Sequence, residues 1–136
     1  AWAGSASGLV QLDPLAGDVL GRTTLPAACS RGKSLAVSPD GTTIAVGLER
    51  GLFLRPNGPG DWVAGPGGMS RVTSLSFDPA GRWLLSVGLD GLVRFWDPAG
   101  LIESRVFNWN TGPLRAVAVS ADGSLAAAAT ARRGVV

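Results

Sequence analysis

The chain has 136 residues, of which 46% are hydrophobic and 16% charged, and its formal net charge is +2. These values favour a packed fold over a disordered chain, and the charge is too small to indicate nucleic-acid binding by itself. One cysteine and no histidine exclude an intramolecular disulfide, a Cys/His zinc site and histidine-dependent nucleophilic catalysis within this chain. No apolar run reaches the roughly 18 residues that a membrane span requires, so we expect neither a membrane nor a nucleic-acid partner.

The predicted elements are short apolar runs separated by turns. The opening segment, residues 8–13 (GLVQLD), resembles residues 91–97 (GLVRFWD), so the chain is expected to begin near the third strand of a repeat unit. Short runs with turns between them are typical of an antiparallel meander. The alanine run near the C-terminus favours helix by propensity, but its place in the repeat predicts a strand. The runs after the opening segment cover residues 43–47, 51–55, 82–87, 91–96, 124–129 and 134–136.

One turn pattern recurs three times, as LAVSPDG at residues 35–41, LSFDPAG at 75–81 and VAVSADG at 117–123. The shared glycines, Gly41, Gly81 and Gly123, lie about 40 residues apart, a period that indicates a repeat array. In the first copy, proline presets φ, aspartate favours the turn, and glycine supplies the left-handed residue that closes a hairpin. The repeat therefore predicts an all-β fold, and Asp40 and Asp122 are interpreted as turn residues, not catalytic ones.

Residues 84–97 (LLSVGLDGLVRFWD) resemble the WD-repeat β-propeller family. The resemblance implies four-stranded antiparallel blades around a central channel, and a protein-interaction scaffold without chemistry of its own. It also implies structural roles for Trp96, packed in the third strand of its blade, and for Asp90, hydrogen-bonded in the preceding turn. The chain departs from the family pattern because it has no Gly-His pair and contains Trp-Asp only once.

The repeat divides the chain into parts of four blades. Residues 8–26 are expected to end one blade, residues 33–66 and 71–108 to form two blades, and residues 113–136 to start a truncated one. Propellers usually have four to eight blades, so these parts predict an incomplete ring. The ring would be completed by further sequence of a larger multidomain protein, or by other copies of the chain that associate through exposed edge strands.

Two segments that could carry chemistry are better explained by structure. Residues 27–34 (AACSRGKS) match a loose phosphate-loop pattern, but they run directly into a predicted strand instead of opening a helix. Cys29 lies near Arg31 and Lys33, which would lower a thiol pKa, yet a packed or inert cysteine is the favoured interpretation. We therefore expect no cofactor.

The meander predicts a surface for partners. Connections into first strands and turns between second and third strands should lie at the same end of the blades, where basic residues outnumber the acidic Glu49 and Asp90. This charge predicts an acidic partner surface, although solvated loop charges without a partner explain it equally well. Trp109, in the polar loop at 108–112, could anchor a partner or fold onto its own blade. The basic residues of this end are Arg31, Lys33, Arg50, Arg71, Arg132 and Arg133.

The sequence therefore predicts a non-catalytic protein-interaction scaffold, with Arg31, Arg50, Arg71, Trp109 and Arg132 as partner-binding residues. The alternative is a propeller-based enzyme, or its accessory domain, with catalytic residues outside this segment. The sequence does not determine the compartment, and a cytoplasmic location is the expectation.

Overall fold

The computed structural model describes residues 2–4, 8–12, 15–16, 18–24, 34–56, 61–66 and 69–130, and every helix or strand in these ranges is a β-strand. The prediction of an all-β fold is confirmed, and the alanine run forms a strand. In chain order the strands are β1 (Trp2–Gly4), β2 (Gly8–Leu12), β3 (Val19–Thr24), β4 (Ser34–Val37), β5 (Thr43–Leu48), β6 (Gly51–Pro56), β7 (Val63–Ala64), β8 (Val72–Phe77), β9 (Leu84–Gly88), β10 (Leu92–Asp97), β11 (Ile102–Asn108), β12 (Leu114–Val119) and β13 (Ala126–Thr130).

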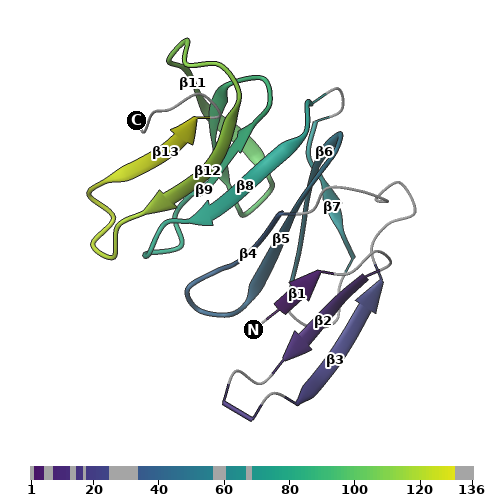
Figure 1. The fold of residues 1–136 in the computed structure, drawn as a ribbon. Coiled ribbons are helices and arrows are strands. Elements are labelled where there is room, and N and C mark those ends of the chain that lie inside the picture. Colours follow the sequence, from purple (N-terminus) through teal and green to yellow (C-terminus); the bar gives the residue numbers. More distant parts are fainter. Residues whose placement is uncertain are drawn as a thin grey trace.

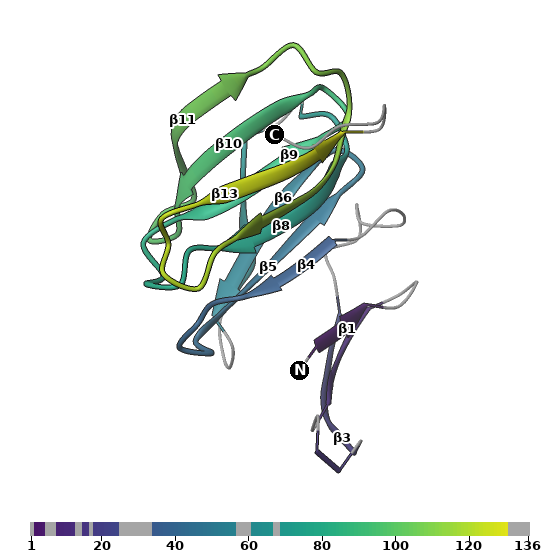
Figure 2. The same cartoon turned by 60° about the vertical axis from the view of Figure 1, so that its left-hand side comes forward.

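The strands form four antiparallel sheets in which neighbours in sequence are neighbours in space (Figure 1). Two sheets are complete four-stranded meanders, β4-β5-β6-β7 and β8-β9-β10-β11, while β1-β2-β3 and β12-β13 have fewer strands. Strand β1 precedes residue 8, where the sequence predicted the first element, and the strand expected at residues 134–136 lies outside the described residues. The sheets of the described part follow one another without closing a ring (Figures 1 and 2).

The repeated turns join the first two strands of three sheets by the same backbone hydrogen bond, and the first and third turns also share a side-chain bond. In the first turn the amide of Gly41 donates to the carbonyl of Ser38 at 2.9 Å, and the hydroxyl of Ser38 donates to Asp40 Oδ1 at 2.7 Å. The third turn repeats both bonds at 2.9 and 2.7 Å between Gly123, Ser120 and Asp122. The closing glycines have φ of 74°, 71° and 72° at Gly41, Gly81 and Gly123.

Apolar side chains fill the space between successive sheets. Leu52 and Leu54 of β6 pack with Leu75, Phe77 and Trp96 of the next sheet in one buried cluster. A second cluster joins the far face of that next sheet to β12-β13 and contains Leu85, Val87, Val93, Leu114, Val117 and Ala128. Both faces of the β8-β11 sheet are thus used for packing, which is how a stack of two-sided sheets buries its core.

Hydrogen bonds also connect the first strands of neighbouring sheets. The hydroxyl of Thr73 in β8 donates to the carbonyl of Leu114 in β12 at 2.7 Å, and the amide of Val117 donates to Ser74 Oγ at 3.2 Å. Ser34 of β4 donates to the carbonyl of Val72 at 3.4 Å. These bonds hold β4, β8 and β12 at fixed positions relative to one another.

Candidate functional site

The connections into the first strands lie beside the turns between second and third strands. The amide of Leu89, in the β9–β10 turn, donates to the carbonyl of Arg71 at 3.1 Å, and the amide of Asp90 donates to Ser70 Oγ at 3.1 Å. A Cβ added to Gly91 in the same turn would lie 2.8 Å from the carbonyl oxygen of Gly112, just before β12. These contacts place the connections into the first strands and the turns between second and third strands at one end of the sheets, as the meander topology predicts.

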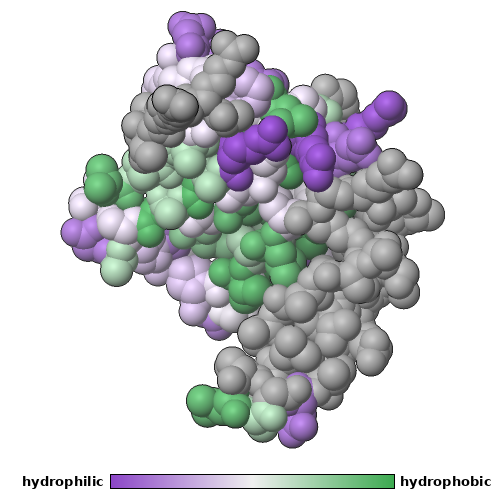
Figure 3. Space-filling view, in the orientation of Figure 1, coloured by the Kyte–Doolittle hydropathy of each residue, from purple (hydrophilic) through white to green (hydrophobic). Residues whose placement is uncertain are grey.

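Three exposed arginines occupy this end, and we call it the arginine end. Arg50 lies in the β5–β6 turn, Arg71 directly precedes β8, and Arg115 is the second residue of β12. None of the three forms an ion pair within the described part of the chain. In Figure 3 strongly hydrophilic side chains lie in the upper half of the molecule, where β8 begins in Figure 1. The predicted partner-binding residues Arg31 and Arg132, with Lys33 and Arg133, lie outside the described residues.

The sequence interpretation did not include Arg115 among these basic residues. Counted from the shared glycine, Arg115 occupies the repeat position of Lys33, which was included, so the repeat itself contained the missing signal. Asp90, one of the two acids expected here, is already neutralised. Arg94 NH1 contacts Asp90 Oδ2 at 2.8 Å, and Arg94 Nε contacts Glu103 Oε2 at 3.3 Å.

Trp109 belongs to an aromatic group on the outer part of the β8-β11 sheet. Its ring stacks on Phe107 with centroids 6.3 Å apart and an interplanar angle of 25°, and Phe107 meets Phe95 edge to face at 5.7 Å. Trp109 nevertheless keeps 41% of its surface exposed. The residue therefore folds onto its own sheet and still offers a ring to solvent.

Trp96 and Asp90 have different surroundings. The indole of Trp96 is fully buried, and its Nε1 donates to Ser86 Oγ at 2.9 Å within the same sheet. Asp90 is exposed in the β9–β10 turn, where its Oδ1 accepts from the amide of Leu92 at 3.1 Å. A buried N–H without an acceptor is costly, so Ser86 explains how the indole N–H of Trp96 is satisfied.

The opposite end of the sheets carries the turn aspartates Asp40, Asp78 and Asp122, and we call it the aspartate end. Hydrogen bonds from the Ser38 hydroxyl and from the amide and hydroxyl of Thr42 lower the pKa of Asp40 to about 2. Equivalent bonds from Ser120 and Ser124 lower the pKa of Asp122 to about 2. Donors to a carboxylate stabilise its charged form, so both groups stay ionised in near-neutral solution.

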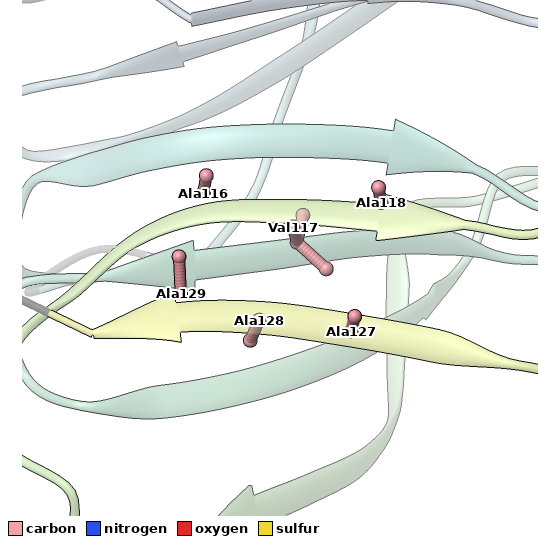
Figure 4. Close-up of a pocket in the computed structure, with 6 residues that line it drawn as sticks. All are labelled: Ala116, Val117, Ala118, Ala127, Ala128 and Ala129. Carbon is pink, nitrogen blue, oxygen red and sulfur yellow. The ribbon is translucent and has the colours of Figure 1, made fainter. Parts of the chain in front are cut away.

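The exposed face of β12-β13 is lined by small apolar side chains. Ala116, Ala118, Ala127 and Ala129 point to one side of the hairpin, and Val117 and Ala128 point to the other (Figure 4). The hollow over these residues has a volume of about 190 Å³. The β4-β5-β6-β7 sheet presents the similarly small Ala36 and Ala45 to the next sheet, which packs against them. This alanine face therefore resembles a sheet-packing surface and has no polar group to orient a ligand.

Groups that could carry metal or membrane functions are limited. Among the described residues, no three His, Cys, Asp or Glu side chains are grouped so that they could hold a metal ion. The described part also has no helix long and apolar enough to cross a membrane. Cys29 and the loose phosphate-loop segment lie outside the described residues, except for Ser34, which begins β4.

Two successive four-stranded antiparallel meanders, packed face to face, define an array of β-sheet blades. Residues 63–97 match the family described as WD domain, G-beta repeat, and this segment runs from β7 to the end of β10. The chain thus carries a WD repeat, and its four-stranded sheets have the architecture of WD-repeat blades. The resemblance predicted from residues 84–97 is confirmed.

One curated relative adds a comparison over a short stretch. Forty residues of the chain are 50% identical to the U3 small nucleolar RNA-associated protein 21 homolog of Schizosaccharomyces pombe (strain 972 / ATCC 24843). The aligned stretch is 28% of this chain and 4% of that protein. The chain therefore spans only a small part of the length of the relative that it matches.

Proposed function

We propose that this chain is a protein-interaction scaffold whose arginine end binds an acidic surface of a partner protein. Arg50, Arg71 and Arg115 carry the proposal, because they are exposed at one end and form no ion pair within the described residues. Glu49 lies beside Arg50 in the same turn, but the three arginines outnumber it, and a net positive surface attracts acidic partners and accelerates their association. WD-repeat domains generally act as scaffolds, which agrees with this reading.

Trp109 and two further arginines complete the proposed surface. The loop that contains Trp109 connects β11 to β12 and therefore lies at the arginine end. A half-exposed tryptophan supplies apolar contact area beside the charges, a combination that is common in binding hot spots. Arg31 and Arg132, which lie outside the described residues, belong to the same predicted surface.

We assign no catalytic role to this chain. A general acid or base works best when its pKa lies near the operating pH, whereas Asp40 and Asp122 have pKa values of about 2. The Oδ1 atom of each of these aspartates is also occupied by hydrogen bonds within its turn. Asp78 is mostly buried and accepts from the backbone and side chain of Arg82. These carboxylates hold turns together and are poorly placed to act on a substrate.

The name of the curated relative introduces a competing partner. That protein is called RNA-associated, and arginines also contact RNA phosphates. We favour protein because the three arginines belong to separate segments of the chain, with aromatic contact area alongside at Trp109. The experiment therefore includes RNA as a second probe.

The test measures binding of two labelled probes to the 136-residue chain by fluorescence anisotropy. One probe is a blocked 12-residue peptide of alternating glutamate and serine, and the other is a single-stranded 12-nucleotide RNA. We expect the combined Arg50→Glu, Arg71→Glu and Arg115→Glu variant to weaken peptide binding roughly tenfold or more, because charge pairs dominate such encounters. The wild-type affinity should also fall as salt is added.

The control variant is Arg82→Gln, which removes an exposed cation at the aspartate end and leaves the arginine end intact. We expect it to bind the glutamate–serine peptide as the wild type does. An equal loss in both variants would contradict a specific arginine end. Tighter binding of RNA than of peptide, lost in the triple variant, would replace the acidic protein by RNA as the partner.

A further inference from the structure

The β9–β10 turn brings a carboxylate next to the connection that enters β8. A Cβ added to Gly88, the last residue of β9, would lie 2.7 Å from the carbonyl oxygen of Arg71 and 3.3 Å from Asp90 Oδ1. Ser70, directly before Arg71, accepts a hydrogen bond from the amide of Asp90 at 3.1 Å. The side chain of Arg71 has a stem of three methylenes, so its guanidinium is long enough to reach the carboxylate of Asp90.

Asp90 nevertheless pairs with a different arginine. The amide of Leu92 donates to Asp90 Oδ1 at 3.1 Å, which directs the carboxylate toward β10, and Asp90 Oδ2 contacts Arg94 NH1 at 2.8 Å. Arg71 is exposed and forms no ion pair in the part of the chain that the structure describes. Asp90 is thus paired with one of two neighbouring arginines and leaves the other without a carboxylate.

A second contact holds Arg94 in its position. Arg94 Nε contacts Glu103 Oε2 of β11 at 3.3 Å, and only 15% of the Arg94 side chain is exposed. Arg94 also belongs to β10, an inner strand of its sheet. Its guanidinium is therefore already ordered, whereas an exposed side chain such as Arg71 loses rotamer freedom when it forms a pair. This difference favours the pair of Asp90 with Arg94 over a pair of Asp90 with Arg71.

The corresponding turn of the preceding sheet lacks this arrangement. In the β5–β6 turn Glu49 directly precedes Arg50, and four positions after Glu49, where Asp90 has Arg94, the chain has Phe53. Glu49 forms no ion pair among the described residues, so its charge is left beside Arg50. Neighbouring charges of opposite sign reduce the potential that a partner meets. The two turns therefore differ in how far an acid offsets the nearby arginine.

We infer that Arg94 is a positioning residue of the arginine end: it holds Asp90 and thereby leaves Arg71 available to the carboxylates of an acidic partner. The inference rests on the proposed function, because it assigns a task within the same surface. Without Arg94, Asp90 would be an unpaired carboxylate beside Arg71. A carboxylate of the same chain has a high effective concentration compared with one on a partner. Arg71 would then pair within the chain and would contribute little to partner binding.

One consequence is that the arginines of this end contribute unequally. We expect Arg71→Gln to weaken binding of the glutamate–serine peptide roughly threefold, the size of one exposed ion pair. Arg50→Gln should weaken it less, because Glu49 already offsets the charge of Arg50. Fluorescence anisotropy with the labelled peptide measures both affinities. A larger loss from Arg50→Gln than from Arg71→Gln would contradict the inferred role of Asp90 and Arg94.

The decisive experiment measures the effect of Arg71→Gln in two backgrounds, the wild type and the Arg94→Gln variant, with the same peptide. We expect a roughly threefold loss in the wild type and no loss in Arg94→Gln, where Asp90 has already paired with Arg71. A general effect of net charge would make the loss equal in both backgrounds, since independent substitutions are additive. Equal losses would overturn the inference and leave the proposed function in place.

Further variants separate the capture of Arg71 from other effects. Adding Asp90→Asn to Arg94→Gln should restore the contribution of Arg71, because no carboxylate is left to pair with it. Arg94→Met removes the guanidinium and keeps a long apolar stem, so the test does not depend on the folding of one variant. Glu103→Gln keeps an oxygen that accepts from Arg94 and should behave as the wild type. Circular dichroism of each variant checks that the strands are retained.

A second measurement requires no partner. Phenylglyoxal modifies arginine side chains, and mass spectrometry follows its reaction with Arg71 in the 136-residue chain. We expect Arg71 to react more slowly in Arg94→Gln than in the wild type, and at the wild-type rate when Asp90→Asn is added. An unchanged rate in Arg94→Gln would overturn the inference. If the wild type fails to bind the peptide up to millimolar concentration, the proposed function itself is overturned, and with it the role of Arg94 in partner binding.

Discussion

At the residue scale, the shared turns depend on glycines in the left-handed region, but their surroundings differ. Gly41 has φ of 74° and no atom within 4 Å of an added Cβ, whereas Gly123 has φ of 72° and Asp78 Oδ1 only 2.9 Å away. The same substitution therefore meets strain alone at one site, and strain together with a steric clash at the other. The two glycines occupy equivalent positions in the repeat, but the neighbouring turns pack differently around them.

We expect Gly41→Ala to lower the free energy of unfolding by about 1 kcal/mol, the cost of a left-handed alanine. Gly123→Ala should cost about 1 to 2 kcal/mol more, because Asp78 must move away from its bonds with Arg82. Urea unfolding of the two variants beside the wild type measures the difference. Equal losses would contradict the contact between Gly123 and Asp78.

A contact between two residues also satisfies the N–H of the buried Trp96. The resemblance to WD repeats predicted that Trp96 is packed, but it did not identify Ser86 as the acceptor of the indole N–H. The two residues lie ten positions apart on adjacent strands, and only the register of Trp96 opposite Leu84 places the indole near Ser86. A hydrogen bond between side chains on neighbouring strands depends on register, which a single sequence specifies only indirectly.

At the scale of elements, the first and third turns are small networks built around an ionised aspartate. Ser38 and Thr42 donate to Asp40, and Ser120 and Ser124 donate to Asp122. Because each pKa falls from 3.8 to about 2, the charged form is favoured in the folded chain. The contribution of each carboxylate to stability is therefore fully present above its ordinary pKa and is lost as the pH falls toward 2.

We expect acid unfolding to report on these turns. In the wild type, the resistance to urea should decrease between about pH 4 and pH 2 as Asp40 and Asp122 become protonated. The combined Asp40→Asn and Asp122→Asn variant should be less stable at neutral pH and should lose less between the same two values. A pH dependence identical to that of the wild type would contradict the assigned role.

The alanine run is the element for which local propensity and repeat position disagreed. Alanine favours helix, yet residues 126–130 pair with β12 as a strand. The run pairs with β12, and this hairpin packs on the β8-β11 sheet through Leu114, Val117 and Ala128. Pairing and burial thus outweigh an intrinsic preference of a few tenths of a kcal/mol per residue.

At the scale of the whole molecule, the first strands couple neighbouring sheets. The Thr73 hydroxyl donates to Leu114 O at 2.7 Å and also lies 3.1 Å from Val87 O, so one side chain joins β8, β9 and β12. Thr73 shares its repeat position with Lys33 and Arg115. The described contacts assign the bridging hydrogen bond to Thr73. The docking of the β12-β13 hairpin should therefore be sensitive to the loss of the Thr73–Leu114 hydrogen bond.

We expect Thr73→Val to destabilise the docking of β12-β13 by about 1 to 2 kcal/mol, because the shape is kept and the donor is lost. Hydrogen exchange followed by mass spectrometry should show faster exchange in residues 114–130 than in the wild type, with residues 43–56 unchanged. Thr73→Ser keeps the hydroxyl and serves as the control. Uniform acceleration over both regions would indicate global destabilisation and contradict a local coupling.

By itself, the sequence determined the class of fold, the repeated turns and the strands beside these turns, because they depend on neighbours along the chain. Alternating apolar residues, the SPDG-type turns and the period of about 40 residues are local or periodic signals. The same topology also placed Arg50 and Arg71 at one end. Only the tertiary structure revealed the contact between Arg94 and Glu103, the stack of Phe107 and Trp109, and the contact between Gly123 and Asp78. These features arise from register and from packing between strands distant in sequence, and a one-residue shift in pairing changes which side chains meet.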